Sequence, residues 1–365
     1  MKHISAKEHQ ILNDPELLRT QQEGYDMLNA LLDGREEEHP FLREYTPSIC
    51  GYNGRSGFDM SPEKEPLAYT DPESWVIECL EDMAAYAETW ERKPWFEPFC
   101  MEYGIFGVHF IDRIFGAEVY FHAPGQWDAA PLKIPVGTLK MPDWENTATW
   151  KMAEIAARTF AAQDVALPAF GLPTIASALN IGVNLFGGEL LIAMMEEPEA
   201  AAHDLKNIND VLIAVHRRFR KLLPSTQIKP VGSMFRALPD GYGQLCGCSC
   251  QLLSGELYRE MVAPLDAALL DVFPKGGMIH LCGSHTQHLD TWVNMPQLKV
   301  YQVGRFDFEQ YNARKRADQL LYFFPADERK NEFPCMELID HAMSVTGGER
   351  MVIMSAVPPQ KKRNK

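Results

Sequence analysis

The sequence is short of positive charge. Its 365 residues carry 35 Lys and Arg against 50 Asp and Glu, which gives a formal net charge of −15. Binding to nucleic acid depends on basic residues that neutralise phosphates, so we expect no nucleic-acid partner. The one basic cluster, Lys361-Lys362-Arg363, stands at the end of the chain, where a solvated tail explains it.

Long apolar runs are also missing. No stretch approaches the roughly 20 residues that a membrane-spanning helix needs, and residues 1–13 lack the apolar segment of a secretory signal. We therefore predict a cytoplasmic protein with no membrane partner. The 8 cysteines are too few for a disulfide scaffold in a chain of this length. In a reducing compartment they would be free thiols, and clusters among them are candidate metal ligands or catalytic groups.

The glycine fingerprint of dinucleotide-binding folds is absent, because Gly241, Gly243 and Gly247 have the wrong spacing. Instead, the second half of the chain alternates short apolar runs with amphipathic helical patterns. This alternation is typical of a parallel sheet with right-handed crossovers. With about seven or eight candidate strands, the pattern predicts an α/β fold, a single (β/α)8 TIM barrel. A doubly wound sheet is the weaker choice.

The chain divides into three predicted parts. Residues 1–95 read as an N-terminal helical and loop extension packed on the barrel, with a long Gly- and Pro-rich loop over 39–69. Residues 96–357 form the barrel, and residues 358–365 form a basic disordered tail. The clearest helix covers about 198–223, where apolar residues recur at steps of three and four.

His280 and Cys282 end a short apolar run that follows the glycine pair Gly276-Gly277 and reads as a buried strand. Residues two apart on a strand point to the same face, so the imidazole and the thiol leave the strand end side by side. Together they form half of a zinc site. The alternative is structural, since a buried cysteine is usually a small apolar side chain.

If the barrel forms, further cysteines are expected near His280, because active sites lie at the carboxyl ends of barrel strands. Cys246, Cys248 and Cys250 follow the preceding candidate strand, and an extended segment would place all three on one side. Cys335 follows a later strand and precedes a helix, whose N-terminus favours a thiolate. The alternative for the Cys246 to Cys250 group is small side chains packed beneath a loop.

Three segments resemble the uroporphyrinogen decarboxylase superfamily. They are Phe-Gly-Ala-Glu-Val at 115–119, Leu-Ser-Gly-Glu-Leu-Tyr-Arg-Glu at 253–260 with Pro264, and the most telling, Ile-His-Leu-Cys-Gly at 279–283. The match is patchy from about residue 95 to 355. The resemblance implies a (β/α)8 barrel with an N-terminal helical extension.

The superfamily has two main branches. One decarboxylates the acetate arms of uroporphyrinogen without a cofactor, and it uses an arginine-bearing Met-Arg-Gln-Ala-Gly-Arg segment near the N-terminus. This chain has only Gly54-Arg55-Ser56-Gly57 there, which does not match. The other branch moves methyl groups to or from corrinoid proteins. Its coenzyme-methylating members hold zinc through a His-x-Cys pair and a later cysteine.

Similarity to the second branch implies one zinc per chain, held by His280, Cys282 and a third ligand. No cysteine follows the last strand, so Cys335 is the first candidate because it keeps the order of the ligands. Cys250 comes second, and Cys248 stays open. The implied partners are a corrinoid protein, which carries the corrinoid cofactor, and a small-molecule methyl donor or thiol acceptor.

The sequence thus predicts an enzyme, a corrinoid-linked methyltransferase. The alternative is a cofactor-free decarboxylase of uroporphyrinogen or a related polycarboxylate, and the second alternative is a non-catalytic barrel that binds a metal or a corrinoid partner. Among the other polar residues, we expect His285 and His288 on the surface. Tyr301 and Gln302 end a strand and are candidates to face a substrate, and Asp240 reads as part of a turn.

Overall fold

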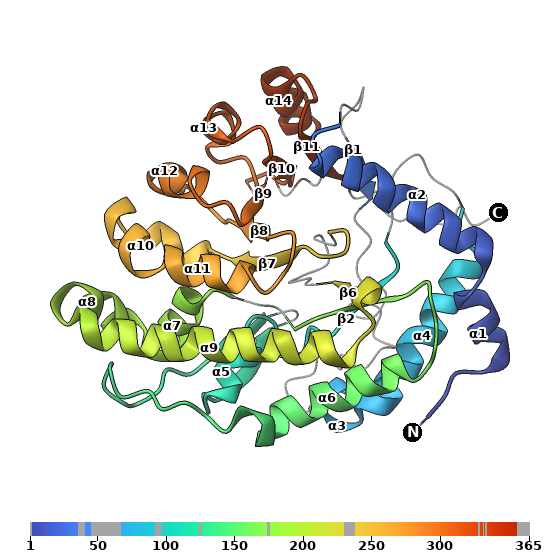
Figure 1. Cartoon of the computed structure of the whole chain (residues 1–365), viewed down its shortest axis with the longest axis horizontal. Helices are drawn as coiled ribbons and strands as arrows, with labels where there is room; N and C mark the ends of the chain where they lie inside the picture. The colour runs from blue at the N-terminus through green and yellow to red at the C-terminus, as the bar shows by residue number, and fades with distance from the viewer. Residues whose placement is uncertain are drawn as a thin grey trace.

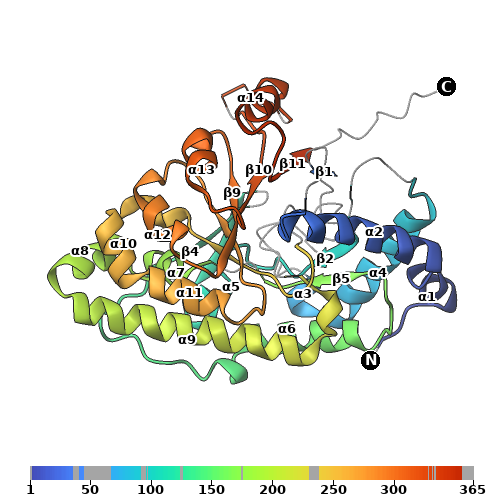
Figure 2. The same ribbon diagram turned by 45° about the horizontal axis from the view of Figure 1, so that its top comes forward.

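A computed structural model of the chain describes residues 2–35, 41–44, 67–91, 96, 98–123, 126–173, 176–229, 238–327, 329, 330, 332 and 334–355. Helices form the outside of the molecule and the strands lie within (Figure 1 and Figure 2). The predicted tail at 358–365 lies outside the described residues, as does most of the predicted loop at 39–69.

Parallel strands form two sheets. The larger has the order β1-β11-β10-β9-β8-β7, and the smaller has the order β2-β5-β6. A bridge between Ala176 and Cys246 joins the segment after β5 to β7, and a separate antiparallel hairpin pairs β3 with β4. The strands are β1 (Phe41–Glu44), β2 (Cys100–Glu102), β3 (Val119–Ala123), β4 (Gln126–Ala129), β5 (Ala169–Gly171), β6 (Ile228–Lys229), β7 (Gly243–Cys246), β8 (Gly277–His280), β9 (Leu298–Val303), β10 (Leu320–Phe323) and β11 (Met351–Ser355).

The mixed α/β class with parallel sheets is confirmed. The named strands of the described ranges show no ladder between β1 and β2, or between β6 and β7, of the kind that would close the sheets into one barrel. Closure into a single (β/α)8 barrel therefore stays a prediction, as does the division at residue 95. The predicted loop over 39–69 contains β1, which pairs with β11 at the edge of the larger sheet. A Gly- and Pro-rich segment gave no sign of this strand.

Fourteen helices are present in the described part of the chain, and none of them alone is long and apolar enough to cross a membrane. Only α7 and α8 together pass that test, as a pair bent by 111°. The helices are α1 (Ala6–Leu12), α2 (Pro15–Leu32), α3 (Leu67–Thr70), α4 (Pro72–Glu88), α5 (Phe110–Ile114), α6 (Ala148–Ala161), α7 (Ala178–Phe186), α8 (Gly188–Glu196), α9 (Pro198–Leu222), α10 (Gly255–Met261), α11 (Ala263–Leu270), α12 (Leu289–Val293), α13 (Phe308–Arg314) and α14 (Met336–Thr346).

Local sequence signals explain several helix ends. The Asp14 side chain accepts hydrogen bonds from the first turn of α2, whose first residue is Pro15. Ser254 caps α10 in the same way, and α11 begins beside Pro264 after a break from α10. The predicted helix over 198–223 is α9, which buries the apolar face that the periodicity marks.

Alternate residues of each strand enter two different cores, because successive side chains of a strand point to opposite faces. Ile279, Tyr301 and Ile353 belong to the large core between the sheet and the surrounding helices. We call this the outer face. Met278 and Val352 belong to a second core on the opposite, inner face.

The inner-face core is covered by α2, which contributes Leu28, Leu31 and Leu32. The same alternation continues to the carboxyl ends of the strands. His280 lies two residues after Met278, so it stands on the inner face beyond the part that α2 covers. The functional candidates therefore share a face with an apolar core but lie at its end.

Gly276→Ala is expected to destabilise the fold by at least about 2 kcal/mol, because the backbone there is left-handed and the new methyl group has no space. Gly276 has φ +73, and a Cβ would lie 2.1 Å from the Gln297 carbonyl oxygen. The control is Gly188→Ala in α8, where nothing lies within 4 Å of the added methyl. Urea denaturation measures both, and equal midpoints for the two variants would contradict the expectation.

Asp266→Asn is expected to stabilise the protein at pH 8 and to leave it nearly unchanged at pH 4. Asp266 is fully buried in α11 and accepts a hydrogen bond of 2.7 Å from the Tyr258 hydroxyl, and burial raises its pKa to about 7. The folded state thus holds a proton that the unfolded chain loses near pH 4, so stability falls as the pH rises from 4 to 7.

The neutral amide avoids that loss, and the expected gain at pH 8 is on the order of 2–4 kcal/mol. Denaturation midpoints at pH 4, 6 and 8 measure the difference between Asp266→Asn and the unchanged protein. Asp210→Asn, at an exposed position beside Lys206, is the control. A gain that does not depend on pH would show that packing, and not the proton, is responsible.

Candidate metal centre

Three neighbouring strands bring polar side chains together at their carboxyl ends. Cys246 of β7 is paired with His280 of β8, and His280 is paired with Gln302 of β9. Residues that are paired across parallel strands point to the same face, so all three side chains lie on the inner face. An imidazole therefore stands between a thiol and an amide.

His280 is held through one ring nitrogen. Its Nδ1 lies 2.8 Å from the Gln302 Oε1, while the Gln302 Nε2 donates to the Met354 sulfur at 3.4 Å. Because the amide nitrogen is directed at Met354, the amide oxygen faces the imidazole and accepts the Nδ1 proton. The Nε2 lone pair is then available as a ligand. Metal-binding histidines are commonly oriented by a hydrogen bond of this kind.

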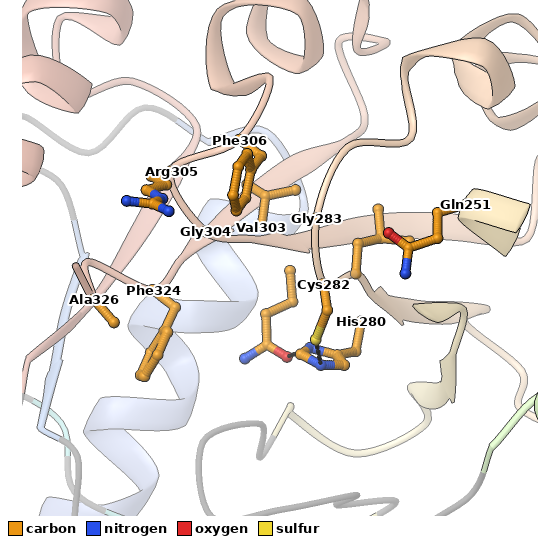
Figure 3. A pocket seen from close by; sticks show the side chains of 12 residues that line it. Gln251, His280, Cys282, Gly283, Val303, Gly304, Arg305, Phe306, Phe324 and Ala326 are labelled. Carbon is orange, nitrogen blue, oxygen red and sulfur yellow. Dashed lines mark hydrogen bonds between the residues drawn. The ribbon is translucent and has the colours of Figure 1, made fainter. Parts of the chain in front are cut away.

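Thiols surround the other ring nitrogen. The Cys282 Sγ lies 3.0 Å from the His280 Nε2 (Figure 3). The sulfurs of Cys246 and Cys248 are 3.4 Å apart. The ligand atoms of Cys246, Cys248 and His280 all lie within 4.8 Å of one another, the one such group found among the described residues.

The loop after β7 turns Cys248 toward this group. Gly247 leads into a short 3₁₀ helix over Cys248–Leu252, and the α7 residue Asn180 ties the loop in place. The Asn180 Oδ1 accepts from the Ser249 backbone at 3.1 Å, and its Nδ2 lies 3.7 Å from the Cys246 sulfur. The loop position of Cys248 is therefore fixed by contacts to a neighbouring helix.

The 3₁₀ turn also corrects the prediction for Cys250. The segment is not extended, so Cys250 does not share a side with the other two cysteines. Its side chain is fully buried in the outer core. Its carbonyl oxygen accepts a hydrogen bond of 2.8 Å from the His288 Nε2.

Cys335, the first candidate for the third ligand, lies at the N-terminus of α14 and is 1% exposed. Its backbone N–H donates to the Pro325 carbonyl at 2.7 Å. The group whose ligand atoms lie within 4.8 Å of one another contains Cys248 and not Cys335. A ligand role for Cys335 stays a prediction.

Contacts between neighbouring thiols favour the protonated form of Cys248. Hydrogen bonds with Cys246 and Cys282 are the largest cause of a pKa of Cys248 well above its usual range, with burial adding to them. Three thiols this close cannot all ionise without a compensating cation. A divalent metal ion among them would supply that charge.

The donor set fits zinc. Thiolate sulfur and imidazole nitrogen are the ligands that zinc prefers, and Zn–S bonds of about 2.3 Å in a tetrahedron separate ligand atoms by about 3.8 Å. The separations of 3.0 Å and 3.4 Å and the limit of 4.8 Å bracket that value. Small side-chain movements would complete the coordination.

A cavity of about 390 Å³ opens beside the cluster, of a size that suits a small molecule (Figure 3). His280 and Cys282 line one side, and Arg305, Phe306 and Phe324 line the other. The Arg305 guanidinium donates to the Asp327 carboxylate at 2.9 Å. The cavity therefore combines aromatic walls with one fixed positive charge.

Sequence reasoning missed Arg305 and Phe306. Both follow β9 directly, in the Gly304-Arg305-Phe306 loop at the carboxyl end of the strand. In a parallel α/β sheet, such loops supply most site residues. The position after the strand was the signal that could have identified them.

The prediction of a surface role for two histidines is wrong. His285 and His288 are both fully buried, and burial lowers the pKa of His285 to about 4. They pack on the aromatic rings of Trp292 and Tyr258, so their neutral form is the stable one.

The two candidates of β9, Tyr301 and Gln302, lie on opposite faces of the sheet. Gln302 lines the cavity beside the candidate metal centre, but Tyr301 does not, because alternation places it in the outer core. The Tyr301 hydroxyl donates to Gln319 there at 3.1 Å. A single step along the strand therefore separates a site residue from a core residue.

Comparison with protein-family models finds no match, and comparison with curated proteins finds none either. Among solved structures, the chain is similar to a methyltransferase from Methanosarcina mazei, with a TM-score of 0.62 and 10% sequence identity. The superposition covers 92% of this chain and 94% of that one. At this identity, the likeness shows a shared fold.

Gln302→Leu is expected to weaken zinc binding by about 10- to 100-fold, because the imidazole loses the acceptor that fixes its orientation. Zinc affinity is measured by competition with a chromophoric chelator. Gln251→Leu is the control, since Gln251 lines the same cavity and is not the partner of the His280 Nδ1. An equal loss in both variants would mean that the cavity, and not the His280 hydrogen bond, sets the affinity.

Proposed function

We propose that this chain is a zinc-dependent methyltransferase that moves a methyl group to or from a corrinoid protein. The observation that carries the proposal is the group of Cys246, Cys248 and His280, whose ligand atoms gather at adjacent strand ends beside a cavity. The fold that the chain shares with a methyltransferase supports it. The sequence segments that resemble the uroporphyrinogen decarboxylase superfamily support it as well, and within them the His280-x-Cys282 pair favours the corrinoid-linked branch.

Cys246, Cys248 and His280 would hold the zinc, with Cys282 as a further donor on the cavity side. Bound zinc stabilises a thiolate, and it would lower the pKa of a substrate thiol in the cavity. Gln302 keeps the imidazole turned toward the thiols. Cys335 remains the ligand that the sequence order favours, and variants of Cys248 and Cys335 separate the two assignments.

The cavity would receive the small-molecule methyl donor or acceptor. Phe306 and Phe324 would give the substrate apolar walls on the side of the cavity opposite His280 and Cys282. Arg305 is held by Asp327, so it would orient a polar end of the substrate without moving. Phe306, at 45% exposed, lies at the opening, where a partner that carries a corrinoid would approach.

A decarboxylase of uroporphyrinogen is the weaker alternative. Its substrate carries many carboxylates, which need several cationic side chains. The described lining of the cavity includes a single arginine, Arg305, which is already paired with Asp327. Gly54 to Gly57 lie outside the described residues.

We expect the purified protein to contain about one zinc per chain, and we expect Cys248→Ser and His280→Ala to lose most of it. Elemental analysis by mass spectrometry measures the content. Cys335→Ser is the discriminating variant: it keeps the metal if the Cys248 assignment holds and loses it if Cys335 is the third ligand. A protein that binds no zinc in any form would contradict the proposal.

Methyl transfer is tested with methylcobalamin as the donor and a panel of small thiols as acceptors. The absorbance change on loss of the cobalt-bound methyl follows the reaction. We expect zinc-dependent turnover that falls by at least about 100-fold in Cys248→Ser. Full zinc content without turnover of any donor would favour a non-catalytic binding protein. Release of carbon dioxide from uroporphyrinogen without zinc would favour the decarboxylase.

A further inference from the structure

A second cavity, of about 400 Å³, opens at the amino ends of the strands, opposite the metal centre. Its lining comes from α2, from the residues just before β5 and at β6, and from the turns before β7 and β8. The cavity is as large as the one beside the metal centre, and none of the predicted site residues lines it. A ligand bound in this cavity would therefore be independent of the proposed function.

Lys229 lies inside this cavity and is only 1% exposed. Its Nζ lies 2.6 Å from the Asp240 Oδ1 and 4.3 Å from the centre of the Tyr25 ring. Burial opposes a charge on Lys229, but Tyr25 and Asp240 outweigh it, so the pKa of the lysine is raised. A protonated lysine is a poor nucleophile, so the pairing of Lys229 with Asp240 favours a binding role.

The charges that line the cavity do not cancel. Lys275 stands at its exposed edge, with its Nζ 3.5 Å from the Asn29 Oδ1. Together with Lys229 it gives two positive charges, against one negative charge from Asp240. A lining with an excess positive charge is notable in a chain whose formal net charge is −15. A bound anion would restore the balance.

The neutral polar groups of the lining suit the same ligand. Asn29 of α2 carries an amide N–H group that can donate to an oxygen of the ligand, while the exposed Gln22 already donates to Asp26 at 2.8 Å. Tyr25 gives the deep end an aromatic wall, and its ring already contacts the Lys229 ammonium. The cavity thus has an amide donor on one side, the buried Lys229 ammonium at its base and the Lys275 ammonium at its mouth.

We propose that this cavity binds the carboxylate or phosphate group of a small molecule, between Lys229 at its base and Lys275 at its mouth. The ligand would connect α2 to the strands whose inner face α2 covers. Because the unfolded chain lacks the site, binding raises the stability of the folded state. This makes the site a regulatory or stabilising one, at the end of the strands away from the metal.

The test uses the full chain with inorganic phosphate and, separately, acetate, at an ionic strength held constant with potassium chloride. Thermal denaturation and titration calorimetry measure binding. We expect a saturable rise in Tm with at least one anion, and the anion that acts identifies phosphate or carboxylate as the preferred group. Lys275→Ala is expected to weaken the apparent affinity at least fivefold.

Lys299→Ala is the matched control, because Lys299 pairs with Asp318 away from the cavity. It should leave anion binding unchanged. Lys229→Met tests the deep position by calorimetry, and Lys275→Ala, at an exposed position, keeps the test decisive if the deep variant does not fold. The proposal is overturned if neither anion gives a saturable response, or if Lys275→Ala and Lys299→Ala respond alike. Zinc content, measured in parallel, should not change in Lys275→Ala.

Discussion

The register between β7 and β8 places Cys246 beside His280, and the candidate metal centre depends on this pairing. A slip of one residue would turn the imidazole to the outer face and separate it from the thiols. Two glycines maintain the register at the other end of the same strand pair. Gly243 is paired with Gly277, and a Cβ on Gly277 would lie 2.3 Å from the Gly243 carbonyl oxygen. Close backbone contact at the amino ends thus determines which side chains meet at the carboxyl ends.

The inner face changes character along each strand. Met278 and Val300 lie in its apolar core, while His280 and Gln302, two residues further along β8 and β9, form the polar end. The apolar part gives the strands a fixed position, because α2 covers it and excludes water. The polar side chains at the strand ends can then keep a fixed arrangement although α2 does not cover them. The packed core next to the candidate metal centre fixes the distances between the candidate ligand atoms.

Patterns carried by neighbouring residues were predictable, and features that depend on distant contacts were not. The predicted strand that carries Tyr301 and Gln302 is β9, and the predicted amphipathic helix over 198–223 is α9, because local sequence patterns determine both. His280 and Cys282 were found because strand alternation is local. Cys335 and Cys250 were ranked ahead of Cys248, which was left open as a ligand. Its position depends on a 3₁₀ turn held by Asn180, about 70 residues earlier in the sequence.

A shared fold at 10% identity does not supply the chemistry of a site. The chemistry must come from this chain's own side chains. Here the donors come from two adjacent strands and the loops that follow them: Cys246 with Cys248, and His280 with Cys282. Each pair alone is a weak motif, since a buried thiol usually serves packing. The strand register joins the two pairs. Hydrogen bonds with Cys246 and Cys282 raise the pKa of Cys248, and a bound cation would favour the ionised thiols instead. The arrangement that makes the thiols unfavourable as free thiolates is therefore the one that favours a metal ion.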